Sequence, residues 1–142
     1  MDSIIQSTRY AGRVIRRQMI KKESISDQAV EFVLQCEDEE LGRLSVSGMA
    51  RTFDVSESFL SRKFRKDKDF SLGKFIFRER MSRSAQTLCN KPGLTVKALA
   101  EIMGFSDYDY FIRIFKKHFG VSPSRYRYCK KQRNSISKSQ NS

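Results

Sequence analysis

Two groups of polar and basic side chains, well separated in the sequence, have types and spacings suited to recognition of a partner molecule. Each group contains an arginine, Arg62 in the first and Arg113 in the second, among residues that share one helix face. An exposed arginine can donate a fork of two hydrogen bonds to a guanine edge in the DNA major groove. The groups are Ser58, Ser61, Arg62 and Arg65, and Asp109, Ile112, Arg113 and Lys116.

Both groups lie in a segment that the chain contains twice. Residues 46–75 return as residues 96–126, with one extra residue in the second copy before the matching arginine. Two copies indicate a duplicated small module and not a repeat array. The best-matched stretches are Phe59-Leu60-Ser61-Arg62-Lys63-Phe64-Arg65-Lys66 and Tyr110-Phe111-Ile112-Arg113-Ile114-Phe115-Lys116-Lys117.

Candidate catalytic and metal-binding residues are few. His118 is the only histidine, and packing or surface placement is its expected role. Cys36, Cys89 and Cys129 lie far apart and form no C-x-x-C pair. We therefore expect reduced thiols, no structural metal site, no cofactor and no enzymatic activity.

The charge of the chain is distributed unevenly. The net charge is +12, yet residues 23–41 hold seven acids and no base. Residues 42–142, which contain both copies, hold 22 bases and eight acids, so a polyanion is the expected partner. Charge alone does not distinguish nucleic acid from an anionic membrane. No apolar run approaches the length of a membrane span, and we expect a cytoplasmic, nucleoid-associated protein.

Each copy reads as a helix, a tight turn and a second helix. In the first copy, Ser45 or Ser47 begins a short helix, and Ser56 caps the second helix after a turn at Asp54. In the second copy, Thr95 is the first cap and Gly104 takes the place of Asp54. Aspartate and glycine both tolerate the left-handed backbone that such a turn needs. Leu60 and Phe64, and Phe111, Ile114, Phe115 and Phe119, are expected to point inward.

The remaining segments complete an all-α fold of about seven helices. A helix over 26–36, capped by Ser26 or Asp27, turns Ala29, Val30, Val33 and Leu34 inward. The acidic run 37–42 is expected to be a solvated loop. Ser71 caps a helix to Cys89, which spans roughly 27 Å and would set the two modules about one DNA turn apart. A last helix begins at Ser122-Pro123.

These elements define five expected regions. They are a leader over 1–26 with a weak helical stripe from Ile4 to Met19, a first helix-turn-helix subdomain over 27–70, a linker helix over 71–90, a second helix-turn-helix subdomain over 91–129 and a disordered basic tail over 130–142.

The second copy resembles the C-terminal signature of the AraC/XylS family of bacterial transcription regulators. The resemblance covers about residues 27–129 and extends into the linker at Phe75-Ile76, Arg80-Met81, Ala85 and Leu88. Its signature residues are Ile102-Met103-Gly104-Phe105, Tyr110-Phe111, Arg113, Phe115-Lys116-Lys117, Phe119-Gly120, Pro123 and Tyr126-Arg127.

The resemblance implies two helix-turn-helix subdomains reading adjacent major grooves, with base-reading positions at Ser58, Ser61 and Arg62 and at Tyr108, Asp109, Ile112 and Arg113. Two residues depart from the family pattern. Asp109 stands where a small polar residue is usual, and it repels phosphate but can accept from cytosine. Ile112 stands where a hydroxyl residue is common, and it could contact a thymine methyl group or nothing.

The leading interpretation is a sequence-specific transcription activator that binds double-stranded DNA as a monomer and contacts RNA polymerase. It would be standalone, like the MarA/SoxS/Rob-type members, or the DNA-binding fragment of a larger effector-controlled regulator. One alternative is a weakly specific architectural DNA-binding protein. Another is a DNA-repair methyl acceptor, which would need one of the three cysteines to be reactive.

Overall fold

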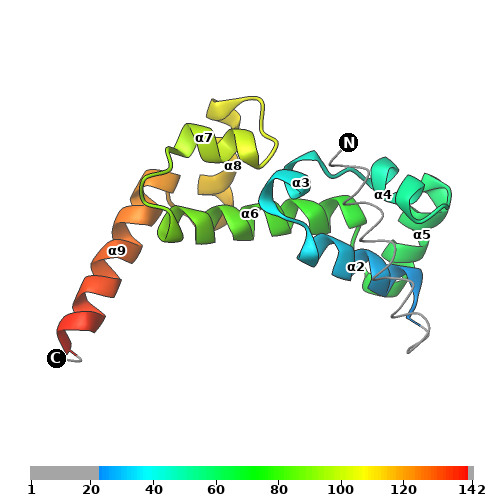
Figure 1. Cartoon of the computed structure of the whole chain (residues 1–142), viewed down its shortest axis with the longest axis horizontal. Helices are drawn as coiled ribbons and strands as arrows, with labels where there is room; N and C mark the ends of the chain where they lie inside the picture. Colours follow the sequence, from blue (N-terminus) through cyan, green and yellow to red (C-terminus); the bar gives the residue numbers. More distant parts are fainter. Residues whose placement is uncertain (1–22, 141–142) are drawn as a thin grey trace. The chain divides into compact units, whose positions relative to one another are not determined.

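The computed structural model describes the backbone of residues 23–140 and the side chains of residues 23–133. All regular secondary structure in this part of the chain is helical, which confirms the all-α expectation (Figure 1). The stripe from Ile4 to Met19 lies outside the described residues. The helices are α2 (Ile25–Gln35), α3 (Asp38–Arg43), α4 (Val46–Thr52), α5 (Glu57–Lys68), α6 (Leu72–Asn90), α7 (Val96–Ile102), α8 (Tyr108–Phe119) and α9 (Pro123–Gln140).

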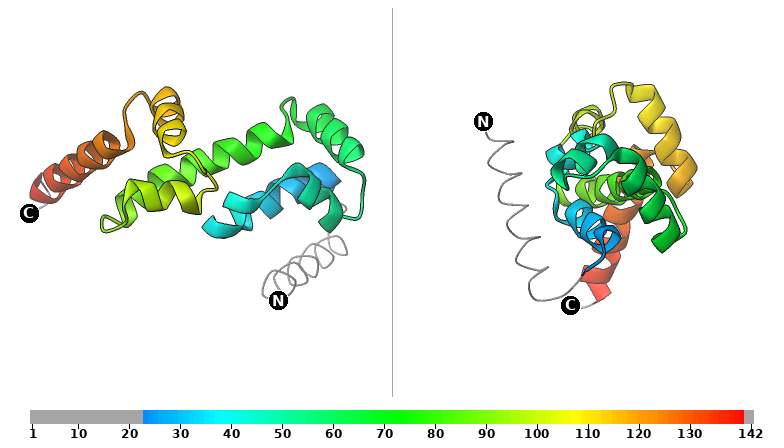
Figure 2. Two further views of the ribbon diagram at one scale, coloured as in Figure 1. Left: turned by 90° about the horizontal axis from the view of Figure 1, so that it is seen from above. Right: turned by 90° about the vertical axis from the view of Figure 1, so that its right-hand side faces the viewer.

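The described helices belong to two compact units. The first unit holds residues 23–37 and 44–77, and the second holds residues 38–43 and 78–140. The boundary falls inside α6, which is one continuous helix (Figure 2). The chain therefore enters the second unit to form α3 and returns to the first unit for α4. This division differs from the expected one, in which the whole of α6 is a linker between subdomains.

In the first unit, α5 packs against both α2 and α4. Leu60 and Phe64 on α5 are fully buried, as their spacing predicted, and Met49 on α4 is fully buried as well. The Phe64 ring contacts the rings of Phe70 and Phe75, so the start of α6 joins the same core. This core fixes which face of α5 remains outside.

The start and inner face of α2 differ from the expectation. Ser24, and not Ser26 or Asp27, accepts the capping hydrogen bond from the Asp27 backbone. Ser26 is buried and donates to the Asp67 carboxylate on α5 at 2.7 Å. Leu34, expected to point inward, is 51% exposed, and Phe32 is buried instead. The buried face of α2 therefore includes Ser26, which bonds to α5, and Phe32, and does not include Leu34.

The expectation that residues 37–42 form a solvated loop is wrong, because most of this acidic run folds as α3. Leu41 is fully buried, and Asp38 pairs with Arg83 on α6 at 3.5 Å. Arg80 donates to the Leu41 and Gly42 carbonyl oxygens at 3.0 and 3.3 Å. These carbonyl groups at the C-terminal end of the short helix therefore have a hydrogen-bond donor. Burial lowers the pKa of the Arg80 guanidinium.

In the second unit, α7 packs against α3 and α8, and α8 packs against α9. Leu99, Phe111 and Phe115 are fully buried. Arg127 on α9 donates to the carbonyl oxygens of Leu88, Lys91 and Leu94, which ties the segment after α6 to α9.

Helix α9 is longer than expected. It continues through Gln140, whereas the sequence interpretation placed a disordered tail over residues 130–142. Residues 124–140 contain no glycine or proline, and lysine, arginine and glutamine propagate a helix well once it has started.

Candidate nucleic-acid interface

Helix α5 is positioned by the turn that precedes it. Asp54 adopts a positive φ of 56°, as expected for the tight turn, and the Ser56 hydroxyl accepts from the Phe59 backbone at 3.1 Å. Because Leu60 and Phe64 are buried, the opposite face of the helix is outside. The structure places all four residues predicted for this helix on that exposed face, namely Ser58, Ser61, Arg62 and Arg65.

Arg62 is held close to its own helix. Its Nε donates to the Ser58 carbonyl oxygen at 3.3 Å, one turn earlier. No ion pair joins Arg62 to an acid within residues 23–133. Its position and charge suit a hydrogen-bond donor to a base edge or a phosphate.

Helix α5 is joined to α2 by an ion pair and a hydrogen bond, and a second ion pair lies within α5. Lys68 pairs with Asp27 at 2.6 Å, and Lys63 pairs with Asp67 at 3.3 Å. The bond from Lys68 and the cap hydroxyl of Ser24 hold the pKa of Asp27 below its ordinary value. The hydrogen bond from Ser26 and the charge of Lys63 do the same for Asp67.

Helix α8 repeats this construction in the second unit. Gly104 in the turn has a φ of 84°, and Asp107 caps the helix by accepting from the Tyr110 backbone at 3.1 Å. Gly120 ends the helix with a φ of 83°. Phe111 and Phe115 face the core. Of the predicted residues, Tyr108, Asp109, Arg113 and Lys116 are exposed, and Ile112 is half-buried.

The partial burial of Ile112 limits what this residue can do. It lies beside the exposed residues but part of its surface packs against the protein. Asp109 is exposed one turn before Arg113, and no ion pair joins the two in the described part of the chain. The Arg113 charge is therefore not neutralised by Asp109.

Two exposed aromatic residues were not predicted as part of the interface. Phe59 on α5 and Tyr110 on α8 occupy equivalent positions in the two copies, and each is 45% exposed. The sequence interpretation gave neither residue a role at the interface. The repeat register could have identified them, because each lies next to the buried residue of its helix, Leu60 or Phe111, and so about 100° around the helix from it.

Other features of the described residues do not form a site of comparable order. No three His, Cys, Asp or Glu side chains in that part of the chain could hold a metal ion together. His118 is exposed, with its ring centroid 4.8 Å from that of Phe119. Among residues 23–140, no helix combines the length and apolar character of a membrane span.

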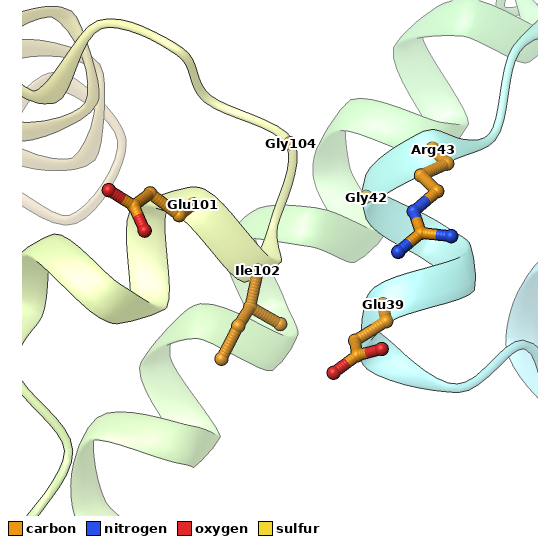
Figure 3. Close-up of a pocket in the computed structure, with 6 residues that line it drawn as sticks. All are labelled: Glu39, Gly42, Arg43, Glu101, Ile102 and Gly104. Atoms are coloured by element: carbon orange, nitrogen blue, oxygen red, sulfur yellow. The ribbon is translucent and has the colours of Figure 1, made fainter.

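An open pocket lies between α3 and α7 in the second unit (Figure 3). Its volume is about 260 Å³. Gly42 and Gly104 approach each other at one side, and charged side chains come from both helices. The lining residues are Glu39, Gly42, Arg43, Glu101, Ile102 and Gly104.

Comparison with known proteins places residues 49–128 in a family described as a helix-turn-helix domain. Over 84 residues the chain is 38% identical to the Msm operon regulatory protein of Streptococcus mutans, covering 59% of this chain and 30% of that protein. It is 32% identical over 84 residues to the transcriptional activator AggR of Escherichia coli, covering 59% of this chain and 31% of that protein. The chain thus spans about a third of the length of these relatives.

The fold also matches a solved structure, the C-terminal domain of AraT, a response regulator from Geobacillus stearothermophilus. The TM-score is 0.65 at 27% sequence identity, over 75% of this chain and 86% of that one. The fold of most of this chain therefore occurs in a protein of solved structure.

Proposed function

Because this chain belongs to the AraC/XylS family of helix-turn-helix transcription regulators, we propose that it regulates transcription by inserting α5 and α8 into the major groove of double-stranded DNA. The supporting observation is the equivalent placement of Arg62 and Arg113. Each is an exposed arginine on the second helix of its copy, and the buried residues of that helix lie on another face.

Base recognition is assigned to the exposed faces of the two helices. Arg62 and Arg113 donate to base edges, and Arg65 and Lys116 neutralise phosphates. Ser58 and Ser61 contribute short polar contacts on α5, and Tyr108 contacts the groove wall at the start of α8. The chain acts as a monomer on cytoplasmic DNA, without a cofactor or an enzymatic step.

Activation through contact with RNA polymerase is the proposed outcome of binding. AggR, similar to this chain over 84 residues, carries the name of a transcriptional activator. The family assignment covers the DNA-binding part, so the remaining length of such relatives can supply control by an effector.

Weakly specific architectural binding is the second candidate. It is favoured by Asp109, which is exposed at the start of α8 and repels phosphate, and by the half-buried Ile112. If these two residues weaken readout by α8, specificity rests on α5 alone.

Selection of bound sites from random duplexes tests the proposal. We expect a defined consensus, bound at least about a thousandfold more tightly than random DNA at fixed salt. The double variant Arg62→Ala/Arg113→Ala should lose most of this ratio while remaining folded. A wild-type ratio close to one would reject sequence-specific regulation and favour the architectural candidate.

A further inference from the structure

The two predicted base-reading arginines are held in different ways. Arg62 donates from Nε to the Ser58 carbonyl oxygen of its own helix. The guanidinium carbon of Arg113 instead lies 6.0 Å from the centroid of the Tyr110 ring, three residues earlier. This distance is within the range of a cation–π interaction.

The Tyr110 ring is itself supported from the core. Its centroid lies 6.3 Å from that of Phe105, and the Phe105 centroid lies 5.1 Å from that of buried Phe111. A continuous series of ring contacts therefore runs from the core of the second unit to the Arg113 side chain. Such support reduces the side-chain freedom that Arg113 would lose on binding.

The first unit lacks this series. Valine, Val55, stands where the second copy has Phe105, and Phe59 stands where it has Tyr110. Within the described residues, no cation–π contact joins Phe59 to Arg62. The equivalent aromatic is therefore exposed in both units but holds an arginine in only one of them.

We propose that Tyr110 is a positioning residue that holds the Arg113 guanidinium for base readout by α8. The proposal rests on the proposed function of α8 as a recognition helix. The ring face carries the effect and the phenol hydroxyl does not, because a cation–π contact uses the ring. Tyr110 would thereby increase discrimination at the one base pair that Arg113 reads.

A double-mutant cycle tests the proposal. The base pair is first identified as the one at which Arg113→Ala loses its preference. Binding of the selected duplex and of a duplex changed at that base pair is then measured at one salt concentration. Tyr110→Leu should reduce this discrimination by about two- to fivefold, the range expected for an exposed cation–π contact. In the Arg113→Ala background the same change should have no further effect.

Three variants separate positioning from other roles. Tyr110→Phe should discriminate like wild type, because it keeps the ring. Phe59→Leu, the matched control, should leave discrimination at the base pair read by Arg62 unchanged. Tyr110→Met replaces Tyr110→Leu if the latter melts at a clearly lower temperature than wild type.

Several outcomes would overturn the proposal. Weaker binding of Tyr110→Phe to all duplexes equally would assign the hydroxyl to a phosphate. Additive effects of Tyr110→Leu and Arg113→Ala, or no base pair affected by Arg113→Ala, would also reject it. If wild-type protein selects no consensus, the proposed function fails as well; a wild-type consensus without coupling rejects the positioning role alone.

Discussion

At the scale of single residues, Arg62 offers the most direct test of base recognition by α5. Arg62→Ala should cost about 1–3 kcal/mol on the best site and relax preference at one base pair, because the arginine fork is lost. Lys66→Ala on the same helix should lower affinity for all duplexes alike. Competition binding with the selected site and random DNA measures the ratio. An unchanged ratio in Arg62→Ala would show that Arg62 does not read a base.

Gly104 has two requirements that no other residue type meets. Its φ of 84° is strained for a side chain, and a Cβ there would overlap the Gly42 carbonyl oxygen. Gly104→Ala should therefore cost at least about 2 kcal/mol of unfolding free energy, measured by urea denaturation. Gly73→Ala is the control, because a Cβ at Gly73 in α6 meets nothing within 4 Å. Equal stability of the two variants would contradict the contact between α3 and the α7–α8 turn.

At the scale of elements, the pairing of α2 with α5 should depend on pH. The pKa values of Asp27 and Asp67 are lowered in the folded protein, so both carboxylates stabilise the fold above their ordinary pKa of about 4. This stabilisation is lost as the pH falls through the lowered values. The melting temperature should be higher at pH 6 than at pH 3. Ser26→Ala should reduce this difference in melting temperature, because it removes the hydrogen bond to Asp67. If the melting temperature of Ser26→Ala changes with pH as much as that of wild type, this hydrogen bond does not contribute to the pH dependence of stability.

The end of α9 gives a second prediction at this scale. Removing residues 130–142 deletes Lys130, Lys131, Arg133 and Lys138 and no acid. Affinity should fall for all sequences, with a shallower dependence on salt and the same consensus, because phosphate contacts carry no sequence information. Binding titrations at several salt concentrations measure the slope. A changed consensus would mean that this part of α9 reads bases.

Capping residues in the sequence made the N-termini of most helices predictable. Ser45, Ser56, Ser71, Thr95 and Ser122 all accept a hydrogen bond from a backbone N–H three residues on, as capping residues do. Helix α3 was not predictable in this way. Its stability depends on Arg80 and Arg83, which lie some forty residues away in the sequence.

The candidate site shows the same distinction. Helical spacing predicted most of the exposed polar and basic residues of α5 and α8, since the buried residues fix the face. It missed the exposed rings of Phe59 and Tyr110, and it placed the half-buried Ile112 outside. Spacing could not predict that Arg113 lies over Tyr110 while Arg62 bonds to a carbonyl oxygen. That difference depends on Phe105, which supports the Tyr110 ring, and on side-chain conformations that spacing does not determine.

At the scale of the whole molecule, duplication determines the symmetry expected of the DNA site. A protein with one recognition helix per chain commonly binds as a two-fold dimer and imposes a palindrome. The two proposed recognition helices of this chain carry different residues, since Asp109 and Ile112 on α8 stand where α5 has Ser58 and Ser61. Because both helices belong to one chain, binding to two grooves does not require a second copy of the protein.

The selected site should therefore be asymmetric, with two blocks of preferred sequence about one helical turn apart, roughly 10–10.5 base pairs. Arg62→Ala should relax only one block and Arg113→Ala only the other, because each arginine belongs to its own unit. Light scattering of the complex should give one protein per duplex. Obligatory binding of two protein chains to a palindromic site would contradict this arrangement. It would mean that one of the two helices in each chain makes no base contacts.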